Sequence, residues 1–219
     1  MCNRLRAILS RLAVYGELEV CWKEDEIVAF EHFEQVFQPI SGLTFSSTIN
    51  GNTEASLHSL PDAPYGWEAI YTQLKPKDAL LERIERLRPK YPYSAVHIRR
   101  TDNHHVLNTL GLPQTTDEEF IEWMKLASGP IYIATDNGIT QRRMQNACAL
   151  IDKEQFTAET LLVDTGSEDR RYTDLACAVV DLWLCAGSSE FMGSRVSSSF
   201  THTIDVMRDL KARGHETNW

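Results

Sequence analysis

The sequence predicts an α/β fold in which helices cover both faces of a parallel sheet, preceded by a smaller N-terminal lobe. Apolar strand patterns and helical patterns alternate from Ser94 onward, which is typical of parallel sheets whose strands are joined by helices. The 219 residues are 42% hydrophobic, enough for one large domain or two small lobes with hydrophobic cores. We place the boundary after residue 90, which gives lobes 1–90 and 91–219.

The N-terminal lobe has few regular patterns. Apolar residues at helical spacing predict helices over 3–15 and 78–87. The second helix ends because Pro89 disfavours helical backbone in the residue before it. Between them, 18–22 predicts a short strand. The segment 26–76, with aromatic residues scattered among Gly, Asn, Ser and Pro, predicts loops with short elements.

Four strand patterns and four helix patterns alternate in the C-terminal lobe. Short apolar runs predict strands over 94–98, 131–134, 161–163 and around 191–192. Helical periodicity predicts helices over 117–126, 139–150, 173–184, and from 198 or 199 to 211. Ligands collect at the carboxyl ends of strands in such sheets, so the residues directly after these strands are the candidate site residues.

Composition excludes several classes of partner. The net charge of −9 excludes long-range attraction to nucleic acid or anionic membranes, so an anionic ligand would need a local basic site. No apolar run reaches the roughly 20 residues that span a bilayer, so we expect no membrane span. The five cysteines form no C-x-x-C pair and are odd in number, which favours a reduced, cytoplasmic compartment over a disulfide framework.

The first candidate site is a pair of arginines at the end of a predicted strand. Apolar Val96 and Ile98 have the pattern of a buried strand end, so Arg99 and Arg100 follow at its carboxyl end. Arginine suits a diphosphate, because its planar and permanently charged guanidinium binds pairs of oxygens bidentately. Asp102 could brace one of the two guanidinium groups. The alternative is a structural Arg–Asp salt bridge.

Two further segments carry polar residues at such positions. Asp136 and Asn137 follow an apolar strand and would face the ligand crevice; the alternative is that this segment caps the following helix. Ser197, Ser198 and Ser199 open the last predicted helix, where N–H groups and the helix dipole favour an anion. Serine is also a favoured helix cap, which is the alternative here.

Other patterns carry less information. Arg4 and Arg6 oppose the dipole of the first predicted helix, which suggests an anionic partner; the alternative is a solvated charged face. The sequence has no P-loop, no G-x-G-x-x-G fingerprint and no D-x-D pair for a nucleotide-bound cation. His104 and His105 are adjacent and have no histidine partner four residues away, so we predict no metal site.

Taken in order, these blocks resemble the GDP-fucose-dependent fucosyltransferase superfamily of α1,6-, nodulation and protein O-fucosyltransferases. Residues 97–102 resemble its H-x-R-R-x-D signature, and 132–137 and 179–200 resemble its second and third motifs. Residues 2–7 are similar to its glycine-rich N-terminal block. The resemblance covers 94–207 and the first dozen residues, and it is weak between them.

The resemblance implies a GT-B-like fold with a Rossmann-type sheet in the C-terminal lobe and a reduced N-terminal lobe. It also implies metal-independent, inverting transfer of fucose from GDP-fucose to a glycan acceptor, with no cofactor beyond the donor substrate. Arg99 or Arg100 would bind the β-phosphate and stabilise the leaving GDP. By the same resemblance, His97 and Asp102 would shape the nucleotide pocket and Glu190 would recognise guanine. Ser197, Ser198 and Ser199 would hold phosphate oxygens, and Asp136 would line the crevice. Asn3 and Arg4 would approach the sugar and the diphosphate from the other lobe.

The sequence departs from the superfamily at three points. It begins at Met1-Cys2 without a preceding strand and glycine turn, its N-terminal lobe is small, and His104-His105 stands where α1,6-fucosyltransferases carry a glutamate base. The catalytic base is therefore unassigned. His104 or His105 could serve as the base, because an unperturbed histidine titrates near neutrality. The alternative is that they are surface-loop residues with no catalytic role. The short lobe and missing glutamate favour an alternative function, a non-catalytic module that binds GDP, a nucleotide sugar or a glycan. A transferase for another nucleotide sugar is a further alternative.

Overall fold

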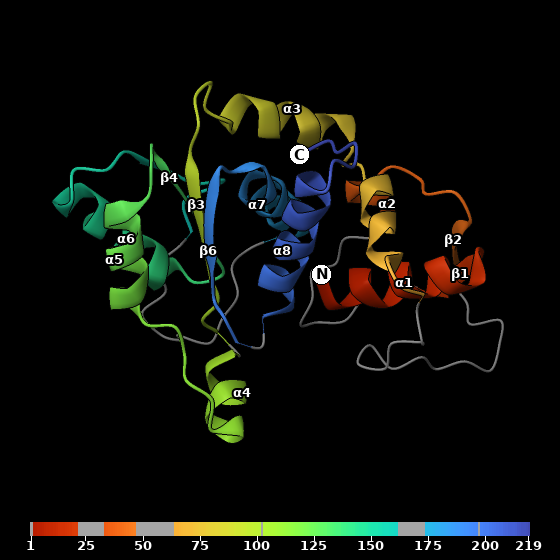
Figure 1. The fold of residues 1–219 in the computed structure, drawn as a ribbon, viewed down its shortest axis with the longest axis horizontal. Coiled ribbons are helices and arrows are strands. Elements are labelled where there is room, and N and C mark those ends of the chain that lie inside the picture. The colour runs from red at the N-terminus through yellow and green to blue at the C-terminus, as the bar shows by residue number, and fades with distance from the viewer. Residues whose placement is uncertain (1, 22–32, 47–63, 102, 162–173, 197) are drawn as a thin grey trace.

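The computed structural model describes residues 2–21, 33–46, 64–101, 103–161, 174–196 and 198–219. Within these ranges the chain forms two sheets, a four-stranded sheet of order β5-β4-β3-β6 and a two-stranded sheet that pairs β1 with β2 (Figure 1). All strand pairs in both sheets are parallel. The α/β class with parallel sheets is therefore the observed one, as the sequence predicted.

The four-stranded sheet brings the ends of β3, β4 and β6 to one edge. Its strands are β3 (Ser94–Ile98), β4 (Ile131–Thr135), β5 (Gln155–Phe156) and β6 (Glu190–Gly193). Ser94 of β3 lies opposite the first residues of both β4 and β6. Because the strands run in the same direction, the segments that follow β3, β4 and β6 meet at the carboxyl edge of the sheet.

Helices cover both faces of this sheet (Figure 1). They are α5 (Asp117–Leu126) and α6 (Gly138–Leu150) on one face, and α7 (Leu175–Gly187) and α8 (Ser199–Ala212) on the other. α4 (Asn103–Leu110) follows β3 and extends away from the sheet (Figure 1). Val96 and Ile98 of β3 belong to one buried cluster with side chains of α5 and α6, whereas Ala95 belongs to another with side chains of α7 and α8. Every residue of β3 and β4 is buried, which explains their continuous apolar sequences.

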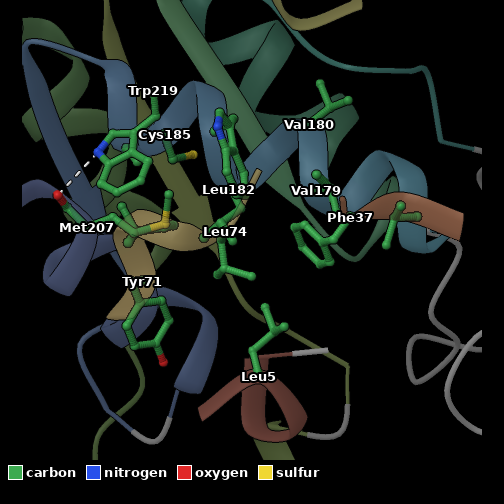
Figure 2. Close-up of a cluster of buried hydrophobic side chains, with 14 of the residues drawn as sticks. Leu5, Phe37, Tyr71, Leu74, Val179, Val180, Leu182, Cys185, Met207 and Trp219 are labelled. Carbon is green, nitrogen blue, oxygen red and sulfur yellow. Dashed lines mark hydrogen bonds between the residues drawn. The ribbon is translucent and has the colours of Figure 1, made fainter. Parts of the chain in front are cut away.

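The N-terminal part of the chain packs against α7 and α8. Its elements are α1 (Cys2–Tyr15), β1 (Leu18–Cys21), α2 (Phe33–Val36), β2 (Leu43–Ser46), η1 (Trp67–Gln73) and α3 (Asp78–Leu87). Leu5, Tyr71 and Leu74 from this part share one buried cluster with Leu182 and Trp219 (Figure 2). The indole of Trp219 donates a hydrogen bond to the carbonyl of Met207, 3.2 Å away. The boundary after residue 90 stays a prediction.

Side-chain caps fix where several helices begin. Thr116 and Glu119 form a reciprocal capping box at the start of α5, with hydrogen bonds of 3.2 and 2.8 Å. Asn137 accepts from the backbone N–H of Thr140 at 2.9 Å and begins α6. Asp174 caps α7 by accepting from the backbone N–H of Cys177. The Asn137 cap starts α6 directly after the end of β4.

Two predicted elements differ from the structure. The strand predicted over 161–163 is wrong at Leu161, whose N–H donates to the side chain of Gln141 instead of a strand; 162 and 163 lie outside the described residues. The edge strand is β5, which pairs with β4 a few residues earlier. The structure also has a helix, α4, over the histidines that one alternative placed in a surface loop.

Two bulk predictions can be compared with the structure. All five cysteines lie within the described ranges and are free thiols. In the part of the chain that the structure describes, no helix has both the length and the apolar character needed to cross a membrane.

Candidate functional site

Hydrogen bonds join the ends of β3 and β6 at the carboxyl edge of the sheet. The backbone N–H of Arg99 donates to the hydroxyl of Ser194 at 2.9 Å. The N–H of Ser194 in turn donates to the carbonyl of His97 at 2.9 Å. This pair of bonds fixes the backbone from which the Arg99 side chain extends.

Asp136 organises the segment that follows β3. Its carboxylate pairs with the guanidinium of Arg99 and accepts from the backbone N–H of Arg100 at 3.1 Å and from the hydroxyl of Thr101 at 2.7 Å. The residue is buried. Asp136 therefore braces an arginine, the role that the sequence suggested for Asp102, which lies outside the described residues. The predicted helix cap in this segment is the neighbouring Asn137.

Arg100 is tied to α5. Its guanidinium donates to the carbonyl of Thr115 at 3.1 Å and to the carboxylate of Asp117 at 2.6 Å, and it lies over the ring of Phe120. Arg143 pairs with the other oxygen of Asp117. Burial alone would raise the pKa of Asp117, but the hydrogen bonds from the two arginines outweigh it and hold that pKa below its usual value. The structure thus contains the Arg–Asp ion pairs that were one of the predicted alternatives.

His97 links β3 to the first turn of α8. Its Nδ1 lies 2.9 Å from the hydroxyl of Thr201, and its ring stacks on Phe200 with centroids 4.5 Å apart. Burial, with a smaller effect from the Arg99 charge, lowers the pKa of His97 to about 3. The imidazole is therefore neutral at physiological pH, and its contacts with Thr201 and Phe200 join β3 to α8.

The serines open α8 as predicted, and one acts as its cap. The hydroxyl of Ser198 accepts from the backbone N–H of Thr201 at 3.2 Å, and the carbonyl of Ser199 accepts from the hydroxyl of Thr203 at 2.9 Å. Ser197 lies outside the described residues. β6 and α8 lie so close together that a Cβ on Gly193 would stand 2.3 Å from a side-chain carbon of Thr201.

The first turn of α1, which carries Asn3 and Arg4, lies near this edge. The thiol of Cys2 is buried, which raises its pKa; a hydrogen bond with Thr203 of α8 and the charge of Arg99 offset part of this rise. Asn3 and Arg4 are themselves partly buried. The structure therefore brings this segment to the same side of the sheet as Arg99.

Glu190 lies at the opposite edge of the sheet. It is the first residue of β6, it pairs with Ser94 at the start of β3, and its carboxylate accepts from the N–H of Ser128 at 3.2 Å. Its register places it three residues before Gly193, which lies opposite His97. Glu190 therefore stands at the amino end of its strand, away from the arginines, and its assignment to guanine stays a prediction.

The sequence patterns did not predict a small cavity beside the carboxyl end of β4. It has room for about one water molecule. Its lining residues are Ile133, Thr135, Gln141, Thr157, Ala158, Glu159, Leu161, Cys177 and Asp181. Thr135 lies directly before Asp136, so the cavity adjoins the arginine edge. Asp181 on α7 is buried and accepts from the hydroxyl of Tyr132. The sequence does contain an indication of this buried acid, because Asp181 is the one acidic residue in the otherwise apolar sequence of α7.

Burial dominates the electrostatics of Asp181. It raises the pKa of this carboxyl to about 7, although the hydrogen bond from Tyr132 opposes the rise. A buried acid that titrates near neutrality and lines a cavity is a marker of a binding or catalytic site.

One group of potential metal ligands lies at the same cavity. Glu159, Asp174 and Cys177 each offer one ligand atom, and these three atoms lie within 4.8 Å of one another. The guanidinium of Arg83 lies 3.2 Å from the sulfur of Cys177, so a positive charge already stands beside this group. The predicted absence of a metal site stays a prediction.

Comparison with known proteins finds similarity at the level of structure. No protein-family model and no curated protein sequence matches the chain. A crystal structure of the α1,6-fucosyltransferase NodZ with GDP has a TM-score of 0.56 at 14% identity, covering 93% of this chain and 87% of NodZ. A structure of fucosyltransferase NodZ from Bradyrhizobium gives 0.54 at 12% identity, with the same coverage. A structure of POFUT1 with GDP-fucose gives 0.49 at 16% identity, covering 76% of this chain.

The likeness to NodZ concerns the fold. It confirms the predicted fold class, an α/β, GT-B-like arrangement with parallel sheets. The chain spans about half the length of the POFUT1 chains, since 51% of that chain is covered. NodZ has been crystallised with GDP and soaked with GDP-fucose.

Proposed function

We propose that this protein is a glycosyltransferase that uses GDP-fucose as donor and transfers fucose to a glycan acceptor. The observation that carries the proposal is the ion pair between Arg99 and Asp136 at the carboxyl edge of the sheet, between the start of α8 and the cavity at Asp181. A diphosphate at this edge would place the sugar of the donor toward α1.

Arg99 is the residue that we assign to the diphosphate. Its backbone is fixed by Ser194 and its guanidinium is oriented by Asp136, so it is preorganised for charge that develops on a departing phosphate. The N-terminal turn of α8, with Ser198 and Ser199, adds N–H groups and hydroxyls for phosphate oxygens. In this arrangement arginine supplies the positive charge that a cation supplies in other transferases.

Arg100 supports the site from behind. Its contacts with Thr115 and Asp117 hold the start of α5, and its backbone N–H meets Asp136. We therefore assign to Arg100 the positioning of Asp136, while Arg99 contacts the ligand.

The cavity at Asp181 has room for about one water molecule, so it is too small for a purine base. The assignment of Glu190 to guanine stays a prediction from the resemblance. Asn3 and Arg4 of α1 would meet the sugar of the donor.

The test is a calorimetric titration of GDP, with UDP and ADP as controls, in buffer that contains EDTA. Selective binding of GDP in EDTA, lost in Arg99→Ala, supports the proposal. Equal binding of all three nucleotides, or of none, contradicts it. Release of GDP from GDP-fucose is then measured with a panel of glycans. GDP binding with no turnover on any glycan would support the non-catalytic binding module.

A further inference from the structure

The segment between β6 and α8 carries an arginine at the carboxyl edge of the sheet. β6 ends at Gly193, α8 begins at Ser199, and Arg195 lies between them. The side chain of Arg195 is exposed. This segment starts at the carboxyl end of a parallel strand and leads into the helix turn that we assign to phosphate oxygens. An arginine within it therefore belongs to the edge where such sheets bind their ligands.

Hydrogen bonds fix the backbone of Arg195 between the segments that carry the other two arginines. Its N–H donates to the hydroxyl of Thr115 at 3.1 Å, and the carbonyl of Thr115 accepts from the guanidinium of Arg100 at 3.1 Å. The preceding residue, Ser194, accepts from the backbone N–H of Arg99 at 2.9 Å. The position of Arg195 relative to Arg99 and Arg100 is thus set by the main chain.

The three arginines differ in their charge partners. Arg99 pairs with Asp136, and Arg100 pairs with Asp117. Among the residues that the structure describes, no carboxylate forms an ion pair with Arg195, and the hydrogen bond at this residue comes from its backbone. Arg195 is therefore the arginine of this edge whose charge is not balanced by a described side chain.

A diphosphate at this edge needs such a charge. A nucleoside diphosphate carries several negative charges, whereas an arginine paired with an aspartate has no net charge as a unit. The paired arginines can still donate N–H groups, but their carboxylates weaken the attraction for an anion. The net charge of the chain is −9, so the whole protein does not supply the missing attraction either.

We infer that Arg195 is a second arginine that contacts the diphosphate. Arg99, oriented by Asp136, supplies fixed hydrogen bonds, and Arg195 supplies the positive charge that this ion pair lacks. The inference rests on the proposed function, because it takes the carboxyl edge as the place of the diphosphate. It gives a role to a residue that the sequence motifs left without one.

The experiment compares Arg195→Ala with Arg86→Ala, which removes an exposed arginine from α3 and changes the net charge by the same amount. Dissociation constants for GDP are measured by calorimetry in EDTA. We expect Arg195→Ala to weaken GDP binding about tenfold, as for the loss of a charged hydrogen bond. Arg86→Ala should match the wild type. Both variants should unfold at the wild-type temperature, because the described hydrogen bond of Arg195 comes from its backbone and is kept.

Two further measurements identify the contribution as one of charge. Arg195→Lys should keep most of the GDP affinity, because lysine binds phosphate as a point charge. The difference between wild type and Arg195→Ala should also shrink as the ionic strength rises from about 0.05 to about 0.5 M, because salt screens an exposed charge. An Arg195→Lys affinity as low as that of Arg195→Ala, or a difference that does not depend on salt, would overturn this role.

The outcomes separate this inference from the proposed function. If the wild type binds GDP selectively but Arg195→Ala binds it as tightly as Arg86→Ala does, the inference is overturned and the proposed function stands. If the wild type shows no preference for GDP, the proposed function fails, and inorganic pyrophosphate still tests the arginine. Weaker pyrophosphate binding in Arg195→Ala than in Arg86→Ala then supports the diphosphate contact, and equal or undetectable binding in the two variants overturns it.

Discussion

The carboxylate of Asp136, at the end of β4, holds the guanidinium of Arg99, at the end of the neighbouring strand β3. The same carboxylate accepts from the backbone of Arg100 and the hydroxyl of Thr101, so one buried acid fixes three consecutive residues after β3. A single side chain thereby determines the direction of the arginine that we assign to the diphosphate.

Asp136→Asn tests this relationship. Asparagine keeps the size of aspartate and one acceptor oxygen, but it lacks the negative charge that orients Arg99. Its NH₂ group would also face the N–H and O–H groups that donate to the carboxylate in the wild type. We expect GDP affinity to fall roughly 10- to 100-fold, as for a lost charge-assisted hydrogen bond. Calorimetry in EDTA measures the change. The control is Asp152→Asn at an exposed aspartate, and equal affinities in both variants would contradict the assignment.

The two arginines should respond differently to substitution. Arg99→Ala should abolish detectable GDP binding with a small change in stability, and Arg99→Lys should also fail, because lysine lacks the bidentate fork. Arg100→Ala removes contacts with Thr115, Asp117 and Phe120, and should destabilise the fold by about 1–3 kcal/mol. Thermal unfolding and GDP titration on each variant separate the two effects. If Arg99→Ala binds GDP like the wild type, Arg99 does not contact the diphosphate.

The fold was predictable where local patterns and packing agree. α3 has the predicted bounds of 78–87, since a buried Ile84 at helical spacing and a following Pro89 act together. β3 and β4 were predictable because strands buried on both faces have continuous apolar sequences. The two-residue strand β5 is too short to produce a periodic signal, and only its pairing with β4 defines it.

The candidate site was predictable in part. Arg99 and Asp136 follow strong strand patterns, and parallel strands necessarily bring their ends to one edge. Glu190 was assigned by resemblance, yet a residue before an apolar strand pattern lies at the amino end, which excludes it from that edge. Asp181 lies within a helix, and only the packing of α7 under β4 shows that it lines a cavity. The sequence does not encode that contact locally.

Gly193→Ala should damage the junction between β6 and α8. The added Cβ would stand 2.3 Å from the Cγ2 of Thr201 and displace the residue that holds His97. We expect a loss of about 1–3 kcal/mol in unfolding free energy, as for other overpacked sites, together with weaker GDP binding. Chemical denaturation measures the first effect. A second substitution, Thr201→Ser, removes the clashing methyl and should restore part of the stability; no restoration would argue against this contact.

Two buried groups should make opposite contributions to the pH dependence of stability. The pKa of His97 is lowered to about 3, so its contribution is complete above the ordinary value of 6.5 and is lost as pH falls toward 3. The pKa of Asp181 is raised to about 7, so its contribution is complete below 3.8 and is lost as pH rises through 7. Between about pH 4 and 6.5 the two effects oppose each other.

His97→Gln should reveal the contribution of Asp181. Relative to wild type, the unfolding free energy of the variant should fall with rising pH between 4 and 6.5, by up to about 1.4 kcal/mol per pH unit. Loss of the contacts with Phe200 and Thr201 adds a constant penalty that does not change with pH. Urea denaturation at several pH values measures this difference. Parallel curves for variant and wild type would mean that His97 is not held neutral by burial.

Asp181→Asn gives the complementary result for the buried carboxyl. Asparagine removes the cost of burying a carboxylate while its oxygen still accepts from Tyr132, so the variant should be more stable than wild type above pH 7, on the order of 3 kcal/mol. Its gain over wild type should shrink as pH falls toward 4. Urea denaturation of variant and wild type at pH 4, 6 and 8 measures this difference. A gain that stays the same at every pH would mean that burial does not raise the pKa of Asp181, because only an ionising carboxyl makes the gain depend on pH.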